Sequence, residues 1–319
     1  MQSAEATNGT DILATIGTRG SPLALVQAGE VRDRLARAHN VAPERLAIKI
    51  IRTSGDAIQD RPLYEAGGKG LFTKEIEEHL LAGSVDIAVH SAKDVPTFLP
   101  DQLWLSAWLP REDVRDVFVS PHAASLSALA AGRTVGTSGP RRRALVARLR
   151  PDLRLANLRG NVDTRLRKIA EGQADATILA MAGLKRLGLQ DRATAIFDPD
   201  EFLPAAGQGA ITLESRRGDE RISQFVAAID DKDTEVALSA ERGFLALLDG
   251  SCRTPIAAHC KVAGDKIDFR GMIISPDGRE LHETTRRGAR GEAAAIGADA
   301  AKELRKRAGE KFFTDFSGA

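Results

Sequence analysis

Apolar residues recur along the first two thirds of the chain with the periods of buried strands and of one-sided helices in alternation. The first such stretch, 12–17, is predicted to be a strand. A helix should begin at Ser21-Pro22, because Ser suits the N-cap and Pro the first helical position. Further strands are predicted at 46–53, 85–89, 154–156, 176–180 and 210–214 and one ending at 134–136, with helices at 71–81, 140–149 and 162–171. This alternation predicts α/β architecture with a largely parallel sheet.

The pattern changes from about residue 233 onward. A helix over 234–248 precedes strands near 256–262 and 267–274, and "SPDG" at 275–278 is a strong turn signal. A last helix is predicted over roughly 291–308. This part of the chain is therefore predicted to form a separate α+β unit.

Composition narrows the class of protein. The 319 residues suffice for two or three domains, and 45 basic against 44 acidic residues give no global attraction to nucleic acid or an anionic membrane. No apolar run approaches the length of about 18 residues that spans a membrane. Residues 1–10 lack the features of a secretory signal and are predicted to be a disordered lead. Two cysteines make no disulfide framework, which favours the reducing cytoplasm.

Charge is balanced globally but not locally, since residues 133–168 contain eleven basic and only two acidic side chains. The segments "IGTRGSP", "VGTSGPRR" and "LRGNVDTR" each place arginine beside a predicted strand-to-helix turn, where helix N-termini offer N–H groups to anions. A solvated basic face is the alternative for any single arginine, but the three turns together favour an anion site. Nucleic acid is a weaker candidate, because aromatic residues for base stacking are missing from this stretch.

Two further stretches carry candidate chemistry. In "VDIAVHSAKDVPT", Asp94 beside Lys93 follows a buried strand; it could be a surface ion pair or a carboxylate used for acid–base work. His90 is expected to be structural, and no histidine or cysteine spacing indicates a metal. Cys260 lies in a predicted strand and should be buried, whereas Cys252 lies in a loop beside Arg253, which would favour the thiolate. On local grounds alone, a single loop cysteine such as Cys252 is more often incidental than functional.

Several segments, taken in order, resemble the porphobilinogen deaminase (hydroxymethylbilane synthase) family. They are "TRGSPLAL", "GGKGLF", "DIAVHSAKDVPT", "GTSGPRR", "LRGNVDTRL", "AGLKRLG", "LPAAGQGA" and "ERGFLALLDGSCRTPIA". Together they extend over about residues 11–280, and the last is similar to the family's signature around its cofactor-bearing cysteine. Gly139-Pro140, Ala92 and Ser251 depart from the commonest family pattern, which puts the fine contacts near Ser138 in doubt but not the activity.

The resemblance implies two periplasmic-binding-protein-like α/β domains that form a cleft, plus a smaller C-terminal α+β domain. The implied limits are 11–109 with 204–230, then 110–203, then 231–319. It also implies a monomeric transferase of tetrapyrrole and haem biosynthesis, which joins four porphobilinogen molecules with release of ammonia into hydroxymethylbilane. The reaction would take place on a dipyrromethane cofactor held by a thioether to Cys252. A polycarboxylate-binding module without chemistry is the alternative.

The same resemblance assigns roles to individual residues. Asp94 would be catalytic and would also contact the cofactor. The other residues implied to bind the cofactor are Cys252, Lys93, Ser91, Thr137, Ser138, Arg141, Arg142, Arg159 and Lys69. The residues implied to bind substrate are Arg19, Arg165, Arg186 and Phe72. Neither a metal nor a nucleic-acid partner is expected.

Overall fold

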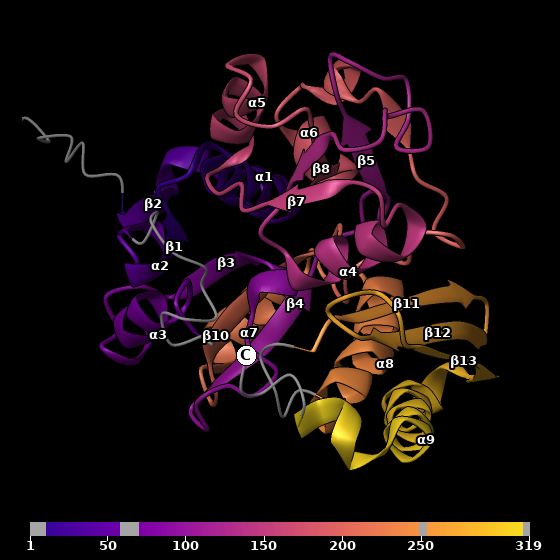
Figure 1. The fold of residues 1–319 in the computed structure, drawn as a ribbon. Coiled ribbons are helices and arrows are strands. Elements are labelled where there is room, and N and C mark those ends of the chain that lie inside the picture. Colours follow the sequence, from indigo (N-terminus) through magenta and orange to yellow (C-terminus); the bar gives the residue numbers. More distant parts are fainter. Residues whose placement is uncertain (1–10, 58–69, 249–253, 315–319) are drawn as a thin grey trace, which may run out of the picture.

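The computed structural model describes residues 11–57, 70–248 and 254–314. Within them the chain forms three units, each built on one sheet (Figure 1). The predicted lead at 1–10 lies outside the described residues, as do Lys69 and Cys252. The α/β and α+β fold class predicted from the sequence is confirmed, while the domain limits stay predictions.

The first unit is a five-stranded sheet in the order β2-β1-β3-β10-β4. Its strands β1, β2, β3 and β4 point the same way, whereas β10 runs antiparallel to both β3 and β4, so the sheet is mixed with a single reversed strand. The strands are β1 (Ala14–Arg19), β2 (Leu46–Ile51), β3 (Ile87–Ser91), β4 (Leu103–Trp108) and β10 (Ile211–Arg216), and the helices are α1 (Pro22–Ala38), α2 (Ser54–Ala57), α3 (Lys74–Leu81) and α7 (Glu220–Ala227).

The second unit repeats this plan with the sheet order β7-β6-β8-β5-β9. Strands β7, β6 and β8 are parallel, and β5 pairs antiparallel with β8 and β9. The strands are β5 (Asp116–Val119), β6 (Thr134–Gly136), β7 (Arg154–Ala156), β8 (Ala176–Ala180) and β9 (Ala195–Ile196), and the helices are α4 (Pro140–Leu149), α5 (Val162–Ala170) and α6 (Met181–Arg186). The chain enters this unit through residues 109–115, the first crossover, and leaves it through 197–210, the second crossover.

The third unit packs two long helices against a three-stranded antiparallel sheet. The sheet extends the two predicted strands by a third, β13, which the sequence did not reveal. The elements are α8 (Lys232–Leu248), β11 (Ile256–Ala263), β12 (Lys266–Ile274), β13 (Leu281–Ala289) and α9 (Ala293–Thr314), with helical geometry interrupted at Gly309. No helix in the described part of the chain is long and apolar enough to cross a membrane.

Apolar cores join the third unit to both others. Ala257, Met272 and Ile274 of its sheet belong to the same buried cluster as Phe118 and Leu145 of the second unit. On the other side, α8 and β12 share a buried cluster with residues of the first unit and of the second crossover: Ala92, Ala206 and Ala210. Figure 1 shows the third unit, in orange and yellow, lying beside α4 and close to β4.

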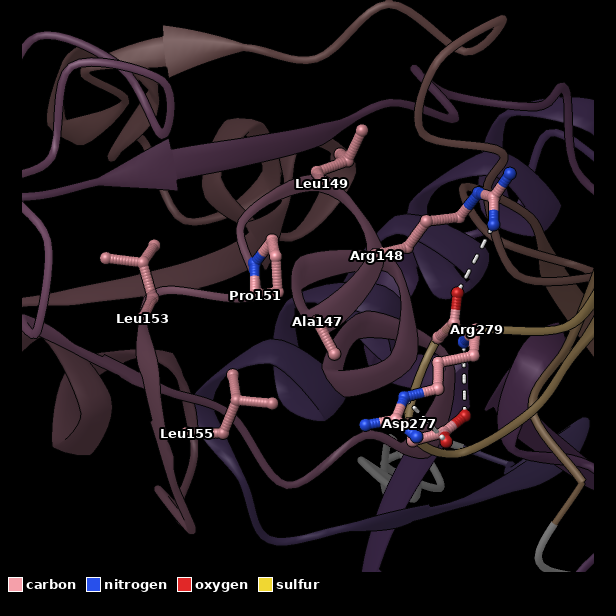
Figure 2. A pocket seen from close by; sticks show the side chains of 9 residues that line it. Ala147, Arg148, Leu149, Pro151, Leu153, Leu155, Asp277 and Arg279 are labelled. Carbon is pink, nitrogen blue, oxygen red and sulfur yellow. Dashed lines mark hydrogen bonds and ion pairs between the residues drawn. The ribbon is translucent and has the colours of Figure 1, made fainter.

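The turn between β12 and β13 lies against α4 (Figure 2). It borders a hollow of about 700 Å³ whose apolar wall is formed by Ala147, Leu149, Leu153 and Leu155. Arg148 Nη1 donates a hydrogen bond to the Gly278 carbonyl oxygen at 3.3 Å. A Cβ on Gly278 would lie 2.6 Å from the Ala144 oxygen and the Arg148 nitrogen, so only glycine lets the turn approach the helix this closely.

The glycine in this turn gives a test of how the second and third units dock. Gly278→Ala forces a side chain into φ +76° and against the α4 backbone, and should lower the free energy of unfolding by about 3 kcal/mol. The control is Gly264→Ala in the β11–β12 turn. There φ is +59° with nothing nearby, so about 1 kcal/mol is expected. Urea unfolding measures both, and equal losses would contradict the close packing of the turn on α4.

Candidate active site

The first part of the site lies at the carboxyl end of the central strand β3. This strand pairs with β1 and β10 and ends at Ser91, after which residues 92–94 form a single 3₁₀ turn. Ala92 is buried in this turn, which leaves Lys93 and Asp94 accessible to solvent. The prediction that these charged residues follow a buried strand is therefore confirmed.

The second part lies at the start of α4 in the second unit. Arg141 and Arg142 are both buried there, against the buried carboxylate of Asp116 at the start of β5. Arg141 Nη2 donates to Asp116 Oδ2 at 2.7 Å, and Arg142 Nε and Nη2 donate to Oδ1 at 3.0 and 2.7 Å. Burial alone would raise the pKa of Asp116, but the two guanidinium groups hold it below its usual value. Two buried cations thus share one buried anion.

The loop before α5 supplies the third part. Asn161 caps this helix by accepting a hydrogen bond from the Thr164 N–H at 2.8 Å, and Arg165 Nε donates to the Gly160 carbonyl oxygen at 2.8 Å. The pKa of Arg165 is lowered to about 10 by burial first, then by Arg142 and Arg159, while Asp94 opposes the shift. Because these charges act on one another, residues of the first and second units meet in a single site.

Lys93 reports the charge balance of this site most directly. Its pKa is lowered to about 8, chiefly because surrounding protein removes part of its hydration, although one side of the residue is open to solvent. Arg142 and Arg141 lower it further, while Asp94 and Asp116 raise it. The cations are therefore only partly neutralised, which is the electrostatic state of a site for an anion.

The loop between β6 and α4 adds two hydroxyl groups. Ser138 Oγ donates to the Leu158 carbonyl oxygen at 3.3 Å. Thr137 Oγ1 is buried and has no hydrogen-bond partner among the described residues, which is costly unless a ligand supplies one. An orphaned hydroxyl beside incompletely neutralised cations fits a ligand rich in carboxylates.

Four of the predicted residues lie in other contacts. The Arg19 guanidinium carbon lies 4.0 Å from the centroid of the Phe72 ring, a cation–π contact between β1 and the segment before α3. Arg186 Nη2 donates to the Gly209 carbonyl oxygen at 3.0 Å, with Nε 3.5 Å from Glu30 Oε2 on α1. Ser91 Oγ accepts from Gln27 Nε2 at 2.9 Å. Within the described residues, no hydrogen bond or ion pair joins Arg186 to Lys93 or Asp94.

The two cysteines differ in what can be said of them. Cys260 is buried on β11, as predicted, and its thiol pKa is raised to about 12 by burial and by Glu241. Cys252 and Lys69 lie outside the described residues, so their predicted roles stay predictions. The segment that contains Cys252 follows α8, a helix whose inner face is buried at Phe244 and Leu248. No cluster of three or more possible metal ligands occurs within residues 11–57, 70–248 and 254–314.

Sequence reasoning missed two polar residues of the site, Asp116 and Gln208. Asp116 precedes a short apolar run, "VFV", and an acid at the head of a buried strand was the available signal. Gln208 was seen only as part of "GQGA", yet its side chain is buried and accepts from Lys93 Nζ at 3.3 Å. Neither contact follows from spacing, because each joins segments far apart in the chain.

The surroundings of Lys93 predict that its ammonium titrates at a lower pH than an ordinary lysine. With a folded-state pKa near 8 against an ordinary 10.5, Lys93 is neutral in the folded protein and charged in the unfolded chain over pH 8–10.5. Unfolding then takes up a proton in that window, so stability of the ligand-free protein should rise with pH there. ¹³C NMR of ε-labelled lysine, assigned with Lys93→Arg, should give a midpoint near 8. An ordinary midpoint would contradict the partial loss of hydration at this ammonium.

Comparisons with known proteins agree with this geometry. Residues 14–224 match the family model described as porphobilinogen deaminase, dipyromethane cofactor binding domain, and residues 236–306 match the porphobilinogen deaminase C-terminal domain. The chain is 76% identical over 310 residues to the porphobilinogen deaminase of Nitrobacter winogradskyi and 74% identical to that of Nitrobacter hamburgensis. Each alignment covers 97% of this chain and 98% of the relative.

Among solved structures, the methionine-binding protein MetQ aligns at 12% identity with a TM-score of 0.45, covering 71% of this chain and 93% of that one. The family assignment rests on the sequence matches, which extend over both the cofactor-binding and the C-terminal parts of the chain. The chain belongs to the porphobilinogen deaminase family.

Proposed function

We propose that Asp94 is the catalytic group with which this enzyme joins four porphobilinogen molecules head to tail, releasing ammonia, into hydroxymethylbilane. The observation that carries the proposal is the accessible carboxylate at the end of β3 among Lys93, Arg142 and Arg165. Loss of ammonia from porphobilinogen leaves a positive charge delocalised onto the pyrrole nitrogen. A fixed carboxylate stabilises that charge and can accept the proton that the ring later loses.

The cations around Asp94 are proposed to hold carboxylates. Each pyrrole of substrate and cofactor carries an acetate and a propionate group, and arginine matches a carboxylate with two parallel N–H donors. Arg141 and Arg142 donate to Asp116, and Arg141 Nη1 also donates to the Leu203 carbonyl oxygen at 2.7 Å, which fixes their direction; the N–H groups that remain would bind a ligand. Lys93, Arg159 and Arg165 would complete the set, and Thr137 and Ser138 would add hydroxyl donors.

Dipyrromethane fits this group of residues on two observations: the orphaned Thr137 hydroxyl and the excess of cations over Asp94 and Asp116. When bound, this cofactor supplies the pyrrole carbon on which the chain grows. We propose that Cys252 anchors it, because a thiolate in a loop is a suitable nucleophile whereas the Cys260 thiol stays protonated. Ser91 and Lys69 are proposed to contribute further contacts.

Arg19, Phe72 and Arg186 are proposed to serve the incoming substrate. The cation–π stack of Arg19 on Phe72 supports this for the first two, because it holds a guanidinium group and an aromatic ring together close to the end of β1. Arg186 would exchange its long contact with Glu30 for a substrate carboxylate. We also propose that the enzyme works as a monomer in the cytoplasm; a solution mass of two chains would contradict the first point.

The anchoring role of Cys252 is tested by the intact mass of the purified protein. The wild-type chain should carry an adduct of two pyrrole units, and Cys252→Ala should lack it because no other nucleophile of suitable pKa is expected to replace the thiol. Cys260→Ala is the matched control and should keep the adduct. An active wild-type protein of unmodified mass would contradict the assignment of a covalent cofactor to Cys252.

The role of Asp94 is tested by Asp94→Asn, which keeps the size of the side chain and removes its charge. We expect kcat to fall by at least about a hundredfold, since both charge stabilisation and proton acceptance are lost. The measurement is porphobilinogen consumption at saturating substrate, with thermal unfolding to show an intact fold. Asp101→Asn, an exposed carboxyl in the loop before β4, should be unchanged. Near-normal turnover of Asp94→Asn would remove this residue from the mechanism.

A further inference from the structure

The buried side chain of Gln208, in the second crossover, lies between the first crossover and the turn that carries Lys93 and Asp94. Its Nε2 donates to the Val114 carbonyl oxygen in the first crossover at 2.7 Å. Its Oε1 accepts from Lys93 Nζ at 3.3 Å. The Gln208 carbonyl oxygen accepts from Arg111 Nε at 2.9 Å. One residue of the second crossover is thus bonded to the first crossover and to the site.

The chemistry of the partners fixes the direction of the Gln208 amide. The Val114 carbonyl oxygen can only accept a hydrogen bond, and the Lys93 ammonium can only donate one. Turning the amide over would place oxygen against oxygen and NH₂ against the ammonium, which costs both hydrogen bonds in a buried place. The carbonyl dipole of Gln208 is therefore held toward Lys93.

Two glycines let the backbone reach this position. A Cβ on Gly207 would lie 2.9 Å from the backbone nitrogen of Lys93, and one on Gly209 would lie 2.3 Å from the Glu112 carbonyl oxygen. Both residues also have positive φ, 74° and 89°. The segment "AGQGA" thereby packs closely between the 3₁₀ turn and the first crossover.

We propose that Gln208 is a positioning residue that fixes the location of the Lys93 ammonium and ties it to the first crossover. The inference rests on the proposed role of Lys93 in holding carboxylates. It goes further by assigning the residue that directs the ammonium. The charged groups that act on Lys93 are Asp94, Asp116, Arg141 and Arg142, and Gln208 is the neutral acceptor among them.

Two substitutions of Gln208 are expected to shift the titration midpoint of Lys93 in opposite directions. Gln208→Glu gives up the hydrogen bond to the Val114 oxygen but offers Lys93 a carboxylate, so it should raise the protonation constant of Lys93 by about tenfold or more. Gln208→Met has nearly the same size and offers no acceptor, so the neighbouring arginines should lower that constant further. The exposed residue Gln173 gives the control, Gln173→Glu, which should change nothing at Lys93.

The test is the Lys93 titration midpoint by ¹³C NMR of ε-labelled holoenzyme, with KM and kcat measured on the same samples. The expected order of midpoints is Met below Gln below Glu. KM should rise several-fold in both Gln208 variants, because the Glu carboxylate draws the ammonium from the ligand and the Met side chain no longer positions it. Identical midpoints in folded variants would overturn the positioning role. That result is separate from the function itself, since Lys93→Met would still lower activity if Lys93 holds carboxylates.

Discussion

The carboxylate of Glu241 lies where the three units meet, and their arrangement depends on it. It is buried on α8, with Arg111 Nη1 and Nη2 donating to its two oxygens at 2.6 and 3.0 Å. The same oxygens accept from the Gly207 N–H at 2.7 Å and the Cys260 N–H at 2.8 Å. Both crossovers and the third sheet are thus bonded to one side chain. A buried charge with this many partners is tolerated, whereas loss of one partner leaves it uncompensated at a cost of about 3–5 kcal/mol.

Besides these contacts of Glu241, the three units differ in the kind of contact they make with one another. The third unit shares apolar cores with the first and with the second. The second unit meets the first crossover and the first unit through polar contacts, such as Lys185 Nζ with Glu112 Oε1 at 2.8 Å and Arg186 with Glu30. The exposed Lys185–Glu112 pair contributes at most about 1 kcal/mol. The angle between the two α/β units is therefore set mainly through their common attachment to α8 and β12.

The sequence was sufficient for elements whose own pattern determines them, and insufficient where distant segments meet. The strands before each turn and the capped start of α1 were predictable from alternation and from Ser21. The return of β10 to the first sheet in antiparallel sense was not, because nothing in "ITLE" specifies its neighbours β3 and β4. For the same reason the arginines of α4 were predicted as ligands, but their common anion, Asp116, was not.

The depressed acidity of Cys260 has a consequence for chemical selectivity. With a thiol pKa of about 12, roughly one molecule in ten thousand carries the thiolate at pH 8. Cys260 lies only eight positions beyond Cys252 in the sequence. Its thiol should nevertheless react with an electrophile very slowly, because almost all of it is protonated. The Glu241 carboxylate that joins the three units is also the charge that, after burial, most raises this pKa. The buried Glu241 carboxylate thereby helps to keep the Cys260 thiol protonated and unreactive.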